Sequence, residues 1–228
     1  MTRRTNARVA GFTFLFYIAV GLTGMVLSNR AASGERTAAK LAGIARHASD
    51  VRVAVVLELL SCFCALVLAV TLYSITREQD PDLAMLALTC RVAEGVIGAV
   101  SLPRELGGLW LATTPGADAP DPAAANALGA FLLKLPSWST TLGATFFAVG
   151  STLFSYLLLR GRMVPVALAW LGVLASILIV VCLPLELVGI LHGPITQLMW
   201  LPMLAFEVPL GLWLVIKGVA MPQRKVSA

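Results

Sequence analysis

Residues 164–190 read VPVALAWLGVLASILIVVCLPLELVGI, and this stretch decides the fold class because its single charged residue is Glu186. A helix needs about 20 mostly apolar residues to cross the hydrocarbon layer of a membrane. The stretch is long enough to do so, and five similar stretches occur elsewhere in the chain. The six expected spans are residues 9–28, 53–75, 83–103, 138–159, 164–190 and 196–217.

The composition of the whole chain agrees with these spans. Of its 228 residues, 58% are hydrophobic and only 13% are charged, whereas soluble domains usually carry roughly 25% charged residues. Six spans and their connections use the full length and leave no room for a separate soluble domain. We therefore expect an all-α, polytopic membrane helix bundle that forms a single integral membrane domain over residues 1–228.

Two connections are long enough to hold short helices at the membrane surface. Residues 29–52 are rich in charge, and their apolar residues recur at helical spacing, which predicts an amphipathic interfacial helix near 36–48. The other long connection contains the turn-rich sequence TTPGADAPDP. Its last two residues, Asp121 and Pro122, are typical of a helix start. They predict a second interfacial helix near 122–135.

The lysines and arginines of the connections predict the orientation, since cytoplasmic connections carry more of them. With the N-terminus inside, nine fall on the cytoplasmic side and seven outside, and five of those seven belong to residues 29–52. If this expected interfacial segment is set aside, the bias becomes clear. We expect both termini to be cytoplasmic.

Five ionisable residues lie inside the apolar stretches, where each costs about 2.5–3.5 kcal/mol on insertion into a membrane. Such residues normally face the interior of the bundle and pair with one another. This makes them the candidate site residues of the chain. They are Glu58, Arg91, Glu94, Glu186 and Glu207.

The third span contains the clearest group of candidates. Arg91 and Glu94 are three residues apart, so they share a helix face and can form an ion pair. Gly95 and Gly98 continue that face with almost no side-chain bulk. Small residues let a neighbouring helix approach closely, or they leave room for a ligand beside the charges. We include both glycines with Arg91 and Glu186 as candidate ligand-binding residues.

The acids outnumber their partner, because four carboxyls face one guanidinium within the spans. Arg91 is expected to pair with Glu94, Glu58 or Glu207. At least one other acid should stay neutral, since burial and neighbouring like charge disfavour a carboxylate. A neutral acid in an apolar pocket can donate a proton. This favours acid/base chemistry on a lipophilic small molecule, isoprenoid or lipid-like, with Glu94, Glu207 and Glu58 as catalytic candidates.

Two alternatives stay open at this point. The acids could form the relay of a proton-coupled small-molecule transporter, which with six helices is expected to be a homo-oligomer. They could also form a structural charge network in a non-catalytic membrane scaffold or sensor. No inverted repeat is visible in the sequence to support the transporter.

Other classes of function find no support in the sequence. The basic residues sit at the ends of apolar stretches, where they contact lipid headgroups, so we expect membrane lipids as partners and no nucleic acid. The four cysteines lie apart from the two histidines and form no metal-ligand spacing. No cofactor or metal is expected.

Four stretches together carry a family resemblance. They are 8-RVAGFTFLFYIAVGLTG-24, 90-CRVAEGVIGAV-100, 164-VPVALAWLGVLASILIV-180 and 206-FEVPLGLWLVIKG-218. Over almost its whole length, the chain resembles the bacterial membrane proteins grouped as domain-of-unknown-function family 4386. The resemblance implies six spanning helices in a bacterial inner membrane, and it implies no activity.

Overall fold

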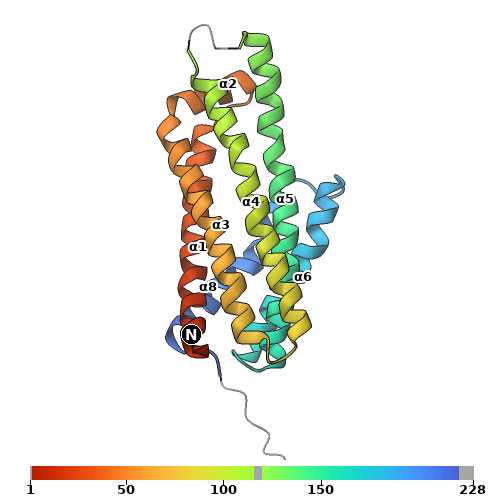
Figure 1. The fold of residues 1–228 in the computed structure, drawn as a ribbon. Coiled ribbons are helices and arrows are strands. Elements are labelled where there is room, and N and C mark those ends of the chain that lie inside the picture. The colour runs from red at the N-terminus through yellow and green to blue at the C-terminus, as the bar shows by residue number, and fades with distance from the viewer. Residues whose placement is uncertain (1, 116–119, 221–228) are drawn as a thin grey trace, which may run out of the picture.

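The computed structural model describes residues 2–115 and 120–220, and its regular elements within these ranges are all helices. Figure 1 shows them as a tall bundle. In chain order they are α1 (Arg3–Ala31), α2 (Thr37–Arg46), α3 (Ala48–Thr76), α4 (Pro81–Thr113), α5 (Pro122–Arg160), α6 (Val166–Leu187), α7 (Ile195–Leu198) and α8 (Leu201–Ile216).

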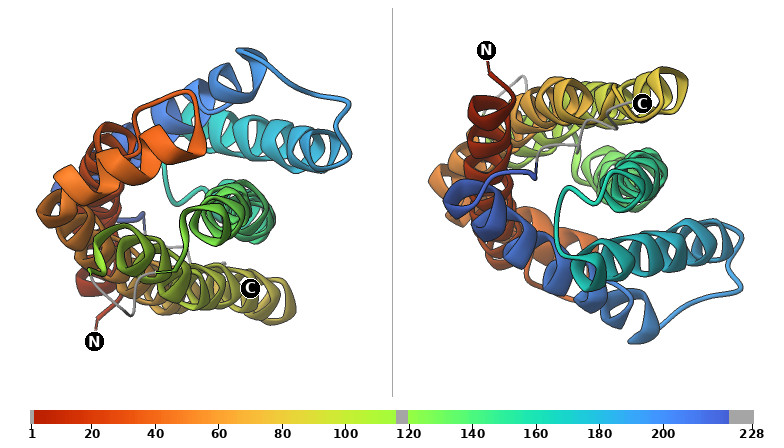
Figure 2. Two further views of the ribbon diagram at one scale, coloured as in Figure 1. Left: turned by 90° about the horizontal axis from the view of Figure 1, so that it is seen from above. Right: turned by 90° about the horizontal axis from the view of Figure 1, so that it is seen from below.

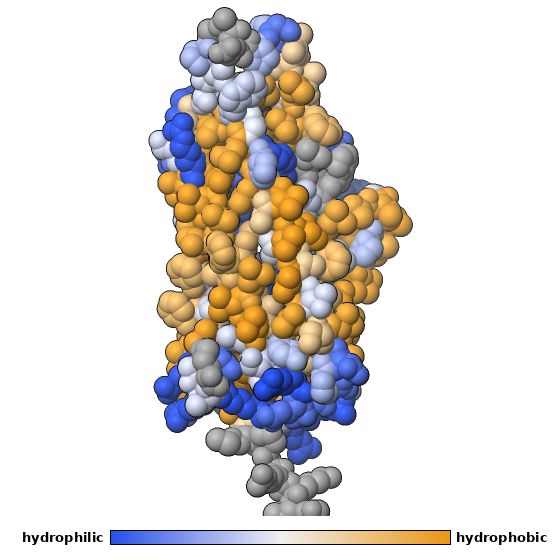
Figure 3. Space-filling model, in the orientation of Figure 1, coloured by the Kyte–Doolittle hydropathy of each residue, from blue (hydrophilic) through white to orange (hydrophobic). Residues whose placement is uncertain are grey.

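In the described part of the chain, six helices are long and apolar enough to cross a membrane, counting α7 and α8 as one. Each overlaps one of the six stretches expected from the sequence. Apolar side chains cover the middle of the bundle, and hydrophilic ones gather in a band at its lower end (Figure 3). The protein is a multi-pass helical membrane protein, which confirms the predicted fold class.

The spanning helices form a ring. In order around it, α8 packs on α1, α1 on α3, α3 on α4, α4 on α5 and α5 on α6, and α6 returns to α8. Figure 2 shows this order from both ends of the bundle. The main apolar core fills the ring with residues from every spanning helix, for example Phe14, Leu68, Leu157, Ile179 and Leu210. Side chains that point into the ring therefore meet at its centre.

Local signals explain the helix starts. The Asp80 carboxylate accepts a hydrogen bond from the backbone N–H of Leu83 at 3.2 Å, and α4 begins at the following proline. Asp121 caps α5 in the same way, accepting from Ala123 and Ala124 at 2.9 and 3.1 Å. A capping acid followed by proline suits a helix start, because the first N–H groups have no partner inside the helix.

The expected interfacial helix near 122–135 is not a separate element. It is the first part of α5, which continues without a break into the span expected over 138–159. The alanines and leucines of this segment are good helix formers, so the helix begun at Asp121 continues. The sequence reasoning was wrong to divide the two.

Helix α2 matches the helix expected near 36–48, and it packs against α4 and α5. Its Ile44 lies in a small second core with Ala31, Val51 and Leu109. This core joins the C-terminal end of α1, the start of α3 and the last turns of α4. Helix α2 thus closes one end of the bundle.

The ring is not equally tall all round. Helix α8 has 16 residues and α1 has 29, which at 1.5 Å per residue correspond to about 24 and 44 Å. Close approaches between α8 and α1 are made by Gly11 and Leu15 of α1. Beyond them, Leu22, Met25 and Val26 of α1 are exposed. The half of the bundle nearer α2 therefore has a less complete wall.

Candidate functional site

The centre of the ring holds an ion pair between two residues of α4. Arg91 Nη1 lies 2.9 Å from Glu94 Oε2, and the two side chains are only 1% and 10% exposed. Their spacing of three residues puts them on one helix face. The predicted pairing of Arg91 is confirmed, and its partner is Glu94.

Tyr17 of α1 completes this pair, and the sequence reasoning missed it. Its hydroxyl donates a hydrogen bond to Glu94 Oε1 at 2.8 Å. The Arg91 guanidinium carbon lies 5.7 Å from the centre of the Tyr17 ring and 4.9 Å from that of Phe147, within cation–π range. The sequence does contain a signal for this role, because Tyr17 lies in the middle of an expected span and a buried tyrosine hydroxyl needs a hydrogen-bond partner.

Glu207 reaches the same centre from α8. It is 6% exposed, and its Oε1 atom is buried without a hydrogen-bond partner among the described residues. Arg91 and Glu94 lie within electrostatic range of its carboxyl. The fold therefore brings together three of the five candidate charges, from two helices far apart in the sequence.

Glu58 lies at the edge of this group. It is exposed, although it shares its side of α3 with the buried residues Ala54 and Ser61. A Cβ atom on Gly98 of α4 would lie 3.6 Å from Glu58 Oε1. Glu58 also interacts electrostatically with Glu94 and with Arg104. It thus connects the central cluster with the end of α4 nearer α2.

Glu186 is not part of the cluster. It lies in the last turn of α6, partly exposed, next to the exposed Leu187. No ion pair joins it to another of the described residues. Its placement gives no sign of a shared role with Glu94 and Glu207.

The two glycines of α4 serve the packing of α3. A Cβ atom on Gly95 would lie 3.1 Å from the carbonyl oxygen of Cys62, and one on Gly98 would lie 2.9 Å from the sulfur of the same cysteine. The absence of side chains at these positions lets α3 approach α4 closely. Of the two uses considered for this face, close helix packing is the one that the structure favours.

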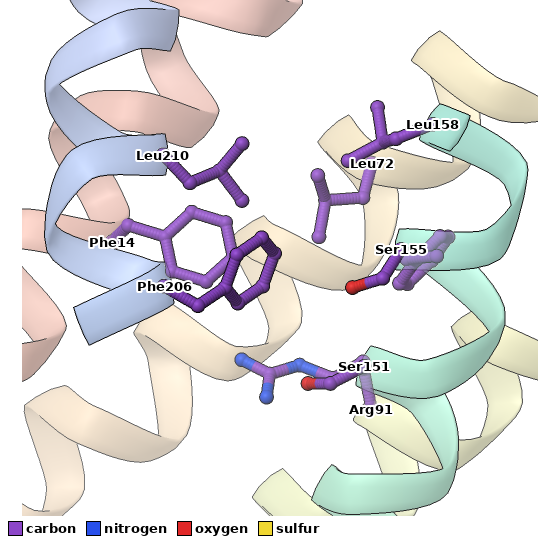
Figure 4. Close-up of a pocket in the computed structure, with 9 residues that line it drawn as sticks. Phe14, Leu72, Arg91, Ser151, Ser155, Leu158, Phe206 and Leu210 are labelled. Atoms are coloured by element: carbon purple, nitrogen blue, oxygen red, sulfur yellow. The ribbon is translucent and has the colours of Figure 1, made fainter. Parts of the chain in front are cut away.

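A cavity of ≈ 10 Å³ lies beside Arg91. Figure 4 shows Arg91 and Ser151 at one end of it and Leu72 and Leu158 at the other. This volume holds about one water molecule, so a lipophilic molecule does not fit there. The lining consists of Phe14, Leu72, Arg91, Ser151, Phe154, Ser155, Leu158, Phe206 and Leu210.

The polar atoms of the cluster are only partly satisfied. All three guanidinium nitrogens of Arg91, including the one in the ion pair, lack hydrogen-bond geometry to any described partner, as does Glu94 Oε2. Buried polar atoms normally have such partners. Among the described residues, no three His, Cys, Asp or Glu side chains gather closely enough to hold a metal ion. The site offers proton donors and acceptors beside one fixed cation.

Comparisons with the curated proteins and with the solved structures give no match. The family model described as "Domain of unknown function (DUF4386)" matches residues 9–218, which include all or most of every spanning helix and all of the central cluster. The chain therefore belongs to this family of unknown function.

Proposed function

We propose that this protein carries out acid/base chemistry on a lipophilic small molecule, isoprenoid or lipid-like, within a bacterial inner membrane. The observation that carries the proposal is the buried Oε1 atom of Glu207, which has no hydrogen-bond partner in the described chain. A general acid or base needs an oxygen that is free to meet its substrate. Unsatisfied buried polar atoms are rare in folded proteins and often belong to functional sites.

The three catalytic candidates differ in how firmly they are held. Glu94 is tied to Arg91 and to the Tyr17 hydroxyl, so its role is to hold negative charge in a fixed place. Glu207 has no such tie, and it lies within electrostatic reach of both members of the ion pair. We assign proton transfer to Glu207 and positioning to Arg91, Glu94 and Tyr17.

The substrate is proposed to enter from the half of the bundle nearer α2. Depth along the bundle can be counted by helical rise from the end of each helix that lies away from α2. On this scale Glu207 lies at about 14 Å, Glu94 at about 20 Å and Glu58 at about 27 Å. All three depths fall within a hydrocarbon layer of about 30 Å. Glu58 is exposed and Glu94 is buried, which supports an approach along this line toward Glu207.

The simplest reaction of this kind moves a double bond. Glu207 gives its proton to one carbon of an alkene, and the resulting carboxylate removes a proton from a carbon next to the cation. The acid is regenerated and the product is an isomer of the substrate. No oxidant, reductant or other reactant is consumed.

Solvent deuterium tests this proposal. Wild-type protein in liposomes, incubated in D2O with a total lipid extract of its host membrane, is expected to yield lipids that carry deuterium on carbon. The Glu207→Gln variant is expected to lower this incorporation by about 100-fold or more, because general acid–base groups contribute that much. High-resolution mass spectrometry of the extracted lipids measures the label.

Glu186→Gln is the matched control, since it makes the same change outside the cluster and should keep full incorporation. Absence of label with wild-type protein, or equal label with the Glu207 variant, would refute the assignment.

A small cavity of ≈ 10 Å³ favours the scaffold or sensor as second candidate, and that function predicts no label at all. Proton flux across the liposomes without labelled lipid would instead favour a transporter.

The orientation is also a proposal, with both termini in the cytoplasm. Both ends of the described chain lie at one end of the bundle (Figure 1). This end carries Arg3, bonded to Glu78, and Arg160, bonded to Asp80. Green fluorescent protein fused after Ala228 is expected to fluoresce in a bacterial host, whereas alkaline phosphatase fused there should be inactive. The reverse result would invert the orientation.

A further inference from the structure

A second hollow lies outside the ring, between α4 and α5. We call it the α4–α5 groove, and its volume is ≈ 290 Å³. Three apolar residues of the groove, Val96, Val100 and Leu142, are 52%, 73% and 48% exposed on the outer surface of the bundle. The lining consists of Val96, Ile97, Val100, Ser101, Arg104, Ser139 and Leu142.

Arg104 is the one ionisable residue among the described residues that line the groove. Its side chain is only 12% exposed, and its Nη2 atom donates to Glu105 Oε1 at 3.2 Å. Its Nη1 atom is buried and has no hydrogen-bond partner in the described chain. The described residues thus supply an acceptor to Nη2 but not to Nη1. A negatively charged oxygen from a ligand could accept a hydrogen bond from Nη1.

The groove changes in character with depth. By helical rise from Pro81, Val96 lies about 22 Å and Arg104 about 35 Å along the bundle. On the antiparallel α5, counted from Arg160, Leu142 lies about 27 Å and Ser139 about 32 Å along it. The apolar residues therefore fall within a hydrocarbon layer of about 30 Å, and the arginine and serine fall just beyond it.

We propose that the α4–α5 groove binds one phospholipid of the leaflet nearer α2, which is the outer leaflet in the orientation proposed above. An acyl chain lies along Val96, Val100 and Leu142, and the phosphate lies against Arg104 and the Ser139 hydroxyl. A small rotation of the guanidinium turns Nη1 toward a phosphate oxygen and supplies its missing acceptor. Arginine suits this task because its fork of donors matches the oxygens of a phosphate.

The occupant follows from the combination of charge and depth. A free phosphate would leave the apolar part of the groove empty, and a diacylglycerol would leave Arg104 without an acceptor. A phospholipid satisfies both parts at the depths where the membrane already places its acyl chains and phosphates. The proposal is independent of the reaction assigned to Glu207, because that residue lies inside the ring.

Native mass spectrometry of the full-length protein tests the site. Dioleoyl phosphatidylethanolamine is the phospholipid probe, and dioleoylglycerol is its diacylglycerol part, without the phosphoethanolamine headgroup. The Arg104→Gln variant is expected to weaken binding of the phospholipid by about tenfold, the size of one hydrogen bond to a charged group. It should leave binding of dioleoylglycerol unchanged.

Arg52→Gln is the matched control. Arg52 is exposed and precedes the end of α3 by 24 residues, so by helical rise it lies about 36 Å along the bundle, close to the depth of Arg104. It should bind both probes like the wild type. Equal phospholipid binding by the two variants would overturn the proposal, as would displacement of the phospholipid by inorganic phosphate.

A third variant keeps the proposal testable if Arg104→Gln does not fold. Val100→Trp should fill the groove from its exposed side and lower binding of both probes. In addition, wild-type protein alone should bind the phospholipid about tenfold more tightly than dioleoylglycerol. Equal affinity of wild-type protein for the two probes would exclude a role for the phosphate.

Discussion

Replacement of Arg91 by methionine is expected to lower the free energy of unfolding by about 3–5 kcal/mol, because it leaves Glu94 buried without its partner. The arginine is the largest of the fully buried side chains in the described chain, and it also loses its contacts with the rings of Tyr17 and Phe147. Unfolding in mixed detergent micelles, followed by circular dichroism, measures the change.

The double variant Arg91→Met, Glu94→Gln should recover a large part of this loss, since removal of both charges leaves no unpaired ion. The Tyr17 hydroxyl can still donate to the amide oxygen of the glutamine. Arg160→Met is the control, because the ion pair of Arg160 with Asp80 is half-exposed and such pairs contribute within about 1 kcal/mol. A single Arg91 variant as stable as the wild type would show that the pair adds nothing.

Replacement of Gly11 by alanine is expected to lower the free energy of unfolding by about 1–3 kcal/mol, the usual cost of overpacking. A Cβ atom at Gly11 would lie 2.6 Å from the carbonyl oxygen of Gly211 and 2.7 Å from the backbone nitrogen of Val215. Both are backbone atoms of the α8 segment, so α1 and α8 must move apart. Because α8 carries Glu207, the same change should also reduce any activity that depends on the cluster.

Gly21→Ala is the matched control, since a Cβ atom there meets nothing within 4 Å. Alanine is the better helix former by about 1 kcal/mol, so this variant should be as stable as the wild type or more so. The same micelle unfolding compares the two variants. If both glycine variants had equal stability, the close contact between α1 and α8 would be excluded as a determinant of the fold.

The spanning helices could be predicted from the sequence because lipid demands apolar side chains whatever the neighbours are. The Arg91–Glu94 pair was predictable for a similar reason, since both residues belong to one helix and three-residue spacing fixes their relation. The break expected between 122–135 and 138–159 was wrong, because local helix preference continued through it. Local rules thus explain both the successes and this failure.

The rest of the cluster depends on which helices are neighbours in the ring. Tyr17 and Glu207 meet Glu94 because α1 stands between α3 and α8. That order is set by close approaches such as the one between Gly11 and Gly211. A single sequence shows that these residues are small, but it does not show which small residue meets which. The hydropathy pattern carries no information about the order of the helices in the ring.

The unequal heights of the helices have a consequence for the surrounding lipid. Helix α5 has 39 residues, and the span formed by α7 and α8 has 22, about 58 and 33 Å of helix on the two sides of one bundle. A hydrophobic segment longer than the hydrocarbon layer tilts or thickens the bilayer beside it. Lipids along α5 should therefore be more extended than those along the α7–α8 span, so that the protein carries a thickness gradient around its circumference.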